Sequence, residues 1–212
     1  MKFLVFSTLL AVSFAANASG APFNVGPWRL GMVPAKVQSF GKFGPYTPIE
    51  PTGGLETVNA SFQGQKTKVS FAFDASGLKT IKIWKYQGAS STAAQAAVID
   101  LFHLFSAKYG GAKVENVNIS GPNGSALTED TLKAVLKRIL GTAKEMTASF
   151  RKKGHFDTLI IFDMRPNQQP LREQLDAQWG YNSKTDKFFA ILYEDRAGVP
   201  IRRAKANLQT VH

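Results

Sequence analysis

The sequence predicts an α+β fold, with helices packed on a mostly antiparallel sheet. Between Leu55 and Tyr86, apolar and polar residues alternate, which is the period-two pattern of strands that bury one face. Two longer segments instead carry apolar residues at spacings of three and four, as amphipathic helices do. Strands and helices in this order favour helices that lie on a sheet built mainly from hairpins.

The chain begins with the pattern of a signal peptide. Lys2 provides a positive charge, and an apolar run of about 14 residues follows, whereas about 20 are needed to span a bilayer as a helix. Ala16 and Ala18 are small residues at the positions that signal peptidase reads. We therefore expect residues 1–18 to be removed and the mature protein to be exported to the periplasm or the extracellular space. An N-terminal membrane anchor is the alternative.

The first half of the mature chain, residues 19–120, combines a short helix with a meander of strands. Pro34 suits the first turn of a helix because its φ is already helical and its missing N–H is not needed there. In the meander, residues 74–77 form a hairpin turn in which Gly77 can adopt positive φ.

A long helix and a short strand complete this half. Ser90 or Ser91 is expected to cap the helix, and Gly110 and Gly111 to end it. A strand is expected from residue 113 to residue 120. The predicted buried stripe of the helix consists of Ala94, Val98, Leu101, Phe102, Phe105 and Tyr109.

The second half, residues 121–212, follows a glycine- and proline-rich break at 121–124. Thr128 is expected to cap a long helix with its stripe at Leu132, Val135, Leu136, Ile139, Ala143, Met146 and Phe150. A strand at 158–164 and a hairpin with arms at 174–181 and 187–194 come next, before a basic tail. The run from Phe188 to Tyr193 is continuously apolar and predicts a central strand covered on both faces. Each half pairs a helix with a hairpin, so two similar halves are consistent with the pattern.

Charge is the strongest compositional signal. The chain has 26 Lys and Arg against 15 Asp and Glu, a net charge of +11, and without Lys2 the net charge is +10. Such a field favours anionic partners: an acidic protein, an anionic envelope polymer or lipid, or nucleic acid. No fold-specific nucleic-acid motif is present, so specific nucleic-acid binding is not expected. Solubility alone is the other explanation of the charge.

Few residues are candidates for catalysis. The chain has no Cys, which excludes disulfides and thiol nucleophiles. His155 and Asp157 are close enough in sequence for the aspartate to orient a general base, and a hydrolase that uses this pair is one alternative. No nucleophile motif accompanies them, however. His103 is expected to be a solvated helix residue. The spacing of His, Asp and Glu suggests no metal site, and no glycine-rich phosphate loop is present, so no cofactor is expected.

One predicted strand face is a candidate for binding. If alternation holds from residue 78 to residue 86, then Lys82, Trp84 and Tyr86 share the face opposite Ile81 and Ile83. Helices over the isoleucines would leave the other face open, and Trp and Tyr are residues that anchor protein interfaces. The alternative is that other elements cover both faces.

A resemblance rests on short motifs between residues 26 and 86. An LGM motif leads into the short helix, and an F-D-x-x-G-L motif forms the hairpin. The matching residues are Leu30, Gly31, Met32, Val37, Phe73, Asp74, Gly77 and Leu78. In these residues the chain resembles small exported α+β proteins of the β-lactamase-inhibitor-protein-like and outer-membrane-assembly-lipoprotein type. The resemblance implies a protein that binds other proteins, often through an open sheet face.

These observations together predict a non-catalytic exported module that binds another protein, such as an inhibitor, an immunity protein or an accessory protein. Lys82, Trp84 and Tyr86 are the expected binding residues. Binding of an anionic envelope polymer or lipid is the first alternative, and hydrolysis by His155 and Asp157 is the second.

Overall fold

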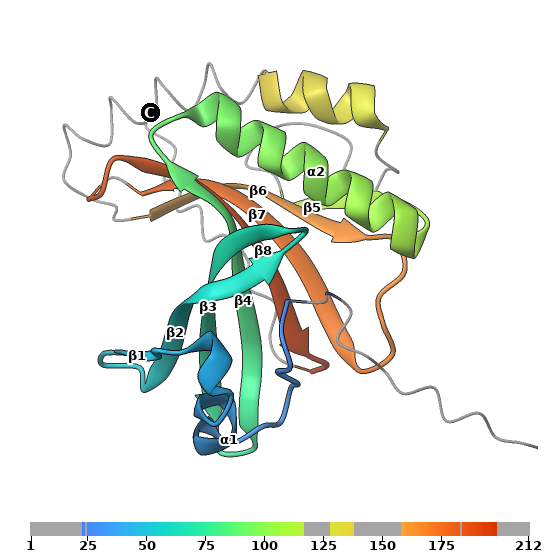
Figure 1. The fold of residues 1–212 in the computed structure, drawn as a ribbon. Coiled ribbons are helices and arrows are strands. Elements are labelled where there is room, and N and C mark those ends of the chain that lie inside the picture. The colour runs from blue at the N-terminus through green and yellow to red at the C-terminus, as the bar shows by residue number, and fades with distance from the viewer. Residues whose placement is uncertain (1–22, 24, 117–127, 138–157, 183, 199–212) are drawn as a thin grey trace, which may run out of the picture.

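The described strands form one antiparallel sheet. The computed structural model describes residue 23 and residues 25–116, 128–137, 158–182 and 184–198. Within them, eight strands are ordered β1-β2-β3-β4-β8-β7-β6-β5, and every neighbouring pair is antiparallel (Figure 1). The predicted α+β class is therefore confirmed.

The elements follow one another along the chain without a parallel crossover. They are α1 (Pro34–Gln38), the 3-10 helix η1 (Gly41–Phe43), β1 (Thr47–Ile49), β2 (Gly54–Phe62), β3 (Gln65–Asp74), β4 (Gly77–Gly88), α2 (Ser91–Tyr109), β5 (Ala112–Asn116), β6 (Thr158–Pro166), β7 (Glu173–Asn182) and β8 (Lys187–Arg196). A further helical segment occupies residues 129–137.

The short helix α1 is joined to the β3–β4 hairpin by backbone hydrogen bonds. Gly31 N donates to Leu78 O and Leu78 N donates to Met32 O, both at 2.7 Å. Gly77 turns the hairpin at φ +96°, and a Cβ there would lie 2.3 Å from the Gly31 carbonyl oxygen. Pro34 begins α1 as predicted. Glycine at position 77 therefore permits both the turn and the close approach of the incoming chain.

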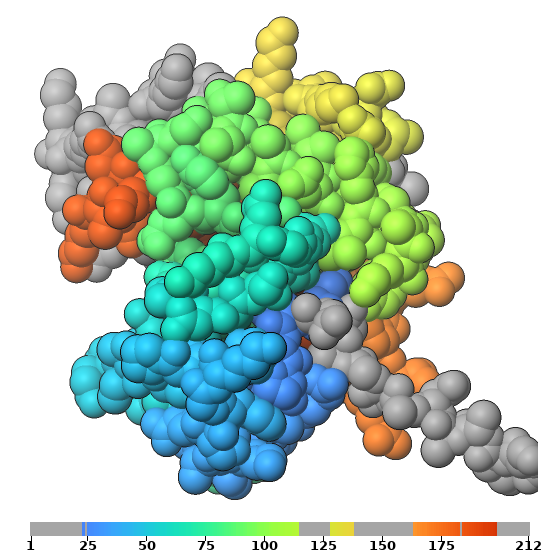
Figure 2. Space-filling model, viewed as in Figure 1, coloured from blue at the N-terminus to red at the C-terminus, as the bar shows by residue number. Residues whose placement is uncertain are grey.

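The long helix α2 covers one face of the sheet, across β4 to β8 (Figure 1). The Ser90 hydroxyl caps it by accepting from Ala93 N, and Gly110 ends it in the left-handed conformation. Of the predicted stripe, all members are buried except Tyr109, which is partly buried against the same cluster. Figure 2 shows α2, in green, lying against the tip of the teal β2–β3 hairpin. Lys85 joins the two, since its Nζ bonds Gln63 Oε1 at 2.5 Å and Asp100 Oδ2 at 3.2 Å.

The helical segment at 129–137 begins as the sequence predicts. The Thr128 hydroxyl accepts from Thr131 N at 3.2 Å, and Leu132 and Leu136 are buried in the same hydrophobic cluster as α2. The rest of the predicted stripe of this helix lies outside the described residues.

The hydrophobic cluster under α2 extends from the N-terminal segment to the last strands. Phe23 contacts the rings of Phe62, Phe105 and Tyr109, and Trp28 lies 4.8 Å from Phe71, measured between ring centroids. The cluster also includes residues of β5 to β8. Strands from both predicted halves therefore share one sheet and one core.

β8 is a central strand, as predicted from its apolar run. It pairs with β4 on one side and β7 on the other, and its residues 189–195 are all buried. The expected signal peptide (1–18), the break at 121–124 and most of the basic tail lie outside the described residues. In the part of the chain that the structure describes, no helix is long and apolar enough to cross a membrane.

Candidate functional site

The predicted binding face differs from expectation at Tyr86. Trp84 pairs with Ile191 in β8, but Tyr86 pairs with Ala190, so Lys85 is an extra residue and forms a β-bulge. The bulge moves Tyr86 to the face that packs against the main core under α2. There its hydroxyl accepts a hydrogen bond from Ser90 N at 3.0 Å. The prediction that Tyr86 shares a face with Lys82 and Trp84 is therefore wrong.

Lys82 and Trp84 do lie on the sheet face opposite α2, and residues of β3 that were not predicted as binding residues lie next to them. Lys68 and Ser70 of β3 lie beside them. The Trp84 indole N–H donates to Ser70 Oγ at 3.1 Å, and the ring packs edge-on against Phe189. These four residues, Lys68, Ser70, Lys82 and Trp84, are called the Lys–Trp surface below.

Two ammonium groups lie against one indole ring in the Lys–Trp surface. Lys68 Nζ is 3.9 Å and Lys82 Nζ is 4.1 Å from the centroid of the Trp84 ring. Such cation–π contacts are worth about 0.5 to 2 kcal/mol each and hold the cations in place. Both lysines and Trp84 are partly exposed. The arrangement therefore presents fixed positive charge next to an aromatic ring.

Lys68 has charged neighbours of both signs. Burial lowers the pKa of Lys68, Glu56 opposes that change, and the nearby charge of Lys187 lowers the pKa further. The Glu56 carboxylate is 4.0 Å from Lys68 Nζ, a long distance for an ion pair. Lys82 Nζ adds a further positive charge on the same indole ring.

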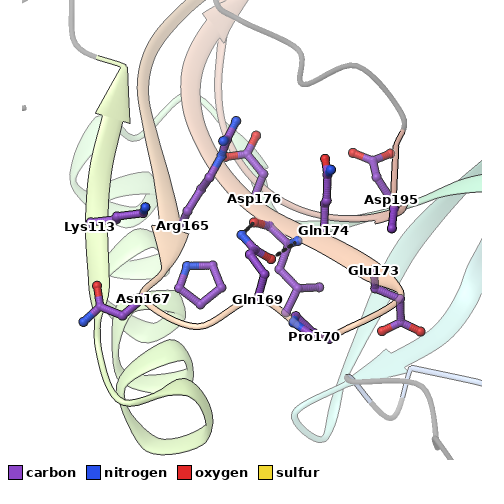
Figure 3. Close-up of a pocket in the computed structure, with 12 residues that line it drawn as sticks. Lys113, Arg165, Asn167, Gln169, Pro170, Glu173, Gln174, Asp176 and Asp195 are labelled. Carbon is purple, nitrogen blue, oxygen red and sulfur yellow. Dashed lines mark hydrogen bonds and ion pairs between the residues drawn. The ribbon is translucent and has the colours of Figure 1, made fainter. Parts of the chain in front are cut away.

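A second feature is a polar cavity of about 280 Å³ at the end of the sheet where the β6–β7 connection lies (Figure 3). It is lined by β5, β6, β7, the end of β8 and the connecting residues 166–173. The Gln169 side chain pairs with the backbone of Leu175 through two hydrogen bonds of 3.0 and 2.7 Å. Asn167 N donates to Gly111 O at 3.0 Å. These bonds fix the wall of the cavity.

Charged groups of both signs line this cavity. Lys113 comes from β5 and Arg165 from β6, whereas Glu173 and Asp176 come from β7 and Asp195 from β8. They are named together here as the charged cavity residues.

The Asp176 carboxyl is the most unusual of the charged cavity residues. Its Oδ2 accepts from Gln178 Nε2 at 3.0 Å, while its Oδ1 is 3.7 Å from Arg165 Nε and has no hydrogen-bond partner among the described residues. Burial raises its pKa well above the ordinary range, the charge of Asp163 adds to this, and Arg165 opposes it. A buried carboxyl that lacks a full set of partners is a candidate functional group.

Glu194 is a further buried acid, on the α2 side of β8. Burial, with the nearby charge of Glu173, raises its pKa to about 8 against the opposing effect of Arg29. Burial raises the pKa of Tyr109 to about 12, with contributions from Glu173 and Glu194. In the sequence, the only sign that Glu194 is buried was its position directly after the apolar run of β8.

The polar residues of β7 were not among the predicted functional residues. In β7, polar and apolar residues alternate from Leu175 to Trp179. On its own, this is the pattern of a strand with one solvent-exposed face. The neighbouring strand could have indicated that these residues are buried. Because β8 was expected to be covered on both faces, polar residues on a strand paired with it would be covered as well.

Catalytic groups are few in the part of the chain described here. His155 and Asp157 lie outside it. His103 is exposed, as predicted, and its Nε2 is 2.8 Å from Glu129 Oε2. Asp163, in the predicted strand 158–164, is buried. The described His, Asp and Glu residues include no group that could hold a metal ion.

Comparison of the chain with family models, curated proteins and solved structures gave no match. The resemblance to exported inhibitor-like proteins therefore stays a prediction.

Proposed function

We propose that the protein is an exported, non-catalytic module that binds an acidic partner protein through the Lys–Trp surface. The observation that carries the proposal is the pair of ammonium groups within about 4 Å of the half-buried Trp84 ring. Trp is among the residues most often found at the energetic centre of protein interfaces. Fixed lysines beside it select a partner that supplies carboxylates.

The arrangement favours a protein over a bare polyanion as the partner. A polyanion needs only dispersed positive charge, and its binding falls steeply with salt because exposed charges are screened within about 10 Å at 0.1 M. An aromatic ring held in place by Ser70 and Phe189 offers apolar contact area as well. Binding that uses both is expected to survive moderate salt.

The test compares capture of partners by the mature chain and two variants. Immobilised wild type, Trp84→Ala and Tyr86→Phe would each be exposed to envelope extract at about 0.05 M and about 0.3 M salt. Tyr86→Phe is the matched control, because it alters an aromatic residue of the same strand on the opposite face. Affinity for any captured protein is then measured by calorimetry, and folding of each variant by circular dichroism.

We expect one acidic protein to be retained at the higher salt by wild type and by Tyr86→Phe. Trp84→Ala is expected to weaken its binding at least tenfold. Equal binding by Trp84→Ala would refute the role of this surface. Capture of heterogeneous material only at low salt would instead support the envelope polymer or lipid alternative. The hydrolase alternative, based on His155 and Asp157, stays a prediction.

A further inference from the structure

The segment that lines the polar cavity is held in place by hydrogen bonds between its own residues and neighbouring strands. Gln169 is held by Leu175, and Asn167 is held by Gly111 and by Gly110, whose carbonyl accepts from Asn167 Nδ2 at 3.2 Å. Ala197 N donates to Arg172 O at 3.0 Å, which joins the end of β8 to the same connection. A ligand would therefore enter a formed site, with little ordering of the chain.

The cavity is surrounded by charges of both signs. Figure 3 shows Lys113 and Arg165 on the side formed by β5 and β6, and Glu173 and Asp195 on the side formed by β7 and β8. Asp176 lies beside Arg165, with its Oδ1 3.7 Å from Arg165 Nε. A ligand with only a positive charge would be repelled by the two cations, and one with only a negative charge would be repelled by the carboxylates. A ligand with one charge of each sign matches both sides.

Asp176 supplies the observation that points to a ligand, because its ion pair with Arg165 leaves Oδ1 without a hydrogen bond among the described residues. The residue is 7% exposed and lines the cavity, yet its Oδ1 has no hydrogen-bond donor within the described part of the chain. Arg165 Nε, at 3.7 Å, is beyond hydrogen-bond distance. A buried polar oxygen left in this condition costs about 1 to 3 kcal/mol. An ammonium donor in the cavity would favour the ionised carboxylate and would recover this cost.

The volume limits the size of the ligand. About 280 Å³ is at the lower end of the range of small-molecule sites, roughly 300 to 1,000 Å³. A single amino acid fits such a volume.

We propose that this cavity binds a free α-amino acid, with the ammonium group toward Asp176 and Asp195 and the carboxylate toward Lys113 and Arg165. The site lies outside the Lys–Trp surface, so it goes beyond the proposed protein-binding function and can be tested independently of it.

The experiment uses the mature chain and calorimetric titration with each of the twenty common amino acids. The best ligand is then compared with its methyl ester, which lacks the carboxylate charge, and with its N-acetyl derivative, which lacks the ammonium charge. The variants are Asp176→Asn and Lys113→Gln, with Asp130→Asn, an exposed residue of the 129–137 helix, as the control.

We expect at least one amino acid to bind, and both blocked derivatives and both cavity variants to bind at least tenfold more weakly. Asp130→Asn is expected to bind as wild type does. Absence of binding by all twenty at about 10 mM would overturn the proposal, since that corresponds to less than about 3 kcal/mol of affinity. Equal binding of the ester would overturn it in favour of a simple cation, and equal binding of the acetyl derivative in favour of an anion. If circular dichroism shows that Asp176→Asn does not fold, the proposal is tested with the two blocked derivatives and Lys113→Gln alone.

Discussion

Replacing Glu194 by Gln is expected to stabilise the protein, by an amount that grows with pH. The carboxyl is buried and its pKa is raised from 4.5 to about 8. Between these values the unfolded chain releases the proton while the folded chain retains it, so folding becomes less favourable as pH rises. Each tenfold difference in proton affinity corresponds to about 1.4 kcal/mol, so the ionised form costs the fold about 4 to 5 kcal/mol above pH 8.

Gln keeps the shape of the protonated carboxyl and cannot ionise. The variant should therefore exceed wild type in free energy of unfolding by less than about 1 kcal/mol at pH 5 and by about 4 to 5 kcal/mol at pH 9. Urea unfolding followed by tryptophan fluorescence at both pH values measures the difference. Glu50→Gln, at an exposed position, is the control and should change stability by less than about 0.5 kcal/mol at either pH. A difference between Glu194→Gln and wild type that is the same at both pH values would refute the reasoning.

Three further substitutions test the packing, all by urea unfolding near neutral pH. Gly77→Ala should destabilise the protein by at least about 3 kcal/mol, because a Cβ at φ +96° would also lie 2.3 Å from the Gly31 carbonyl oxygen. Gly110→Ala, at φ +70° with open space around it, should cost only about 1 kcal/mol, and equal losses at the two glycines would argue against the close approach at Gly77. Phe105→Ala empties a fully buried position of α2 and should cost about 3 to 5 kcal/mol. A loss under about 1 kcal/mol would show that α2 does not depend on this contact.

Local signals predicted the elements well. The alternation in β3 and in β4 as far as Trp84, the cap at Ser90 and the end of α2 at Gly110 depend on residues within a few positions of one another, and the structure confirms them. The central place of β8 was also predictable, since only a strand covered on both faces has a continuous apolar run.

Features that depend on distant strands were not predictable in the same way. The bulge at Lys85 is defined against β8, and a count of alternating residues continues through it, so Tyr86 was assigned to the wrong face. The cavity arises because β5 to β8 bring Lys113, Arg165 and Asp176 together from separate segments. No spacing within any one of those segments indicates their proximity.

Pairing between β4 and β8 sets the order in which the sheet can be completed. β2, β3 and β4 are consecutive and can associate as soon as they are synthesised, whereas the contact of Thr80 with Asp195 spans 115 positions of the chain. Until β8 is available, β4 is a strand of 12 residues with one open edge, and an open edge is a template for pairing with other chains. A polypeptide that stops before residue 187 therefore carries an aggregation-prone edge on β4, which β8 covers in the folded protein.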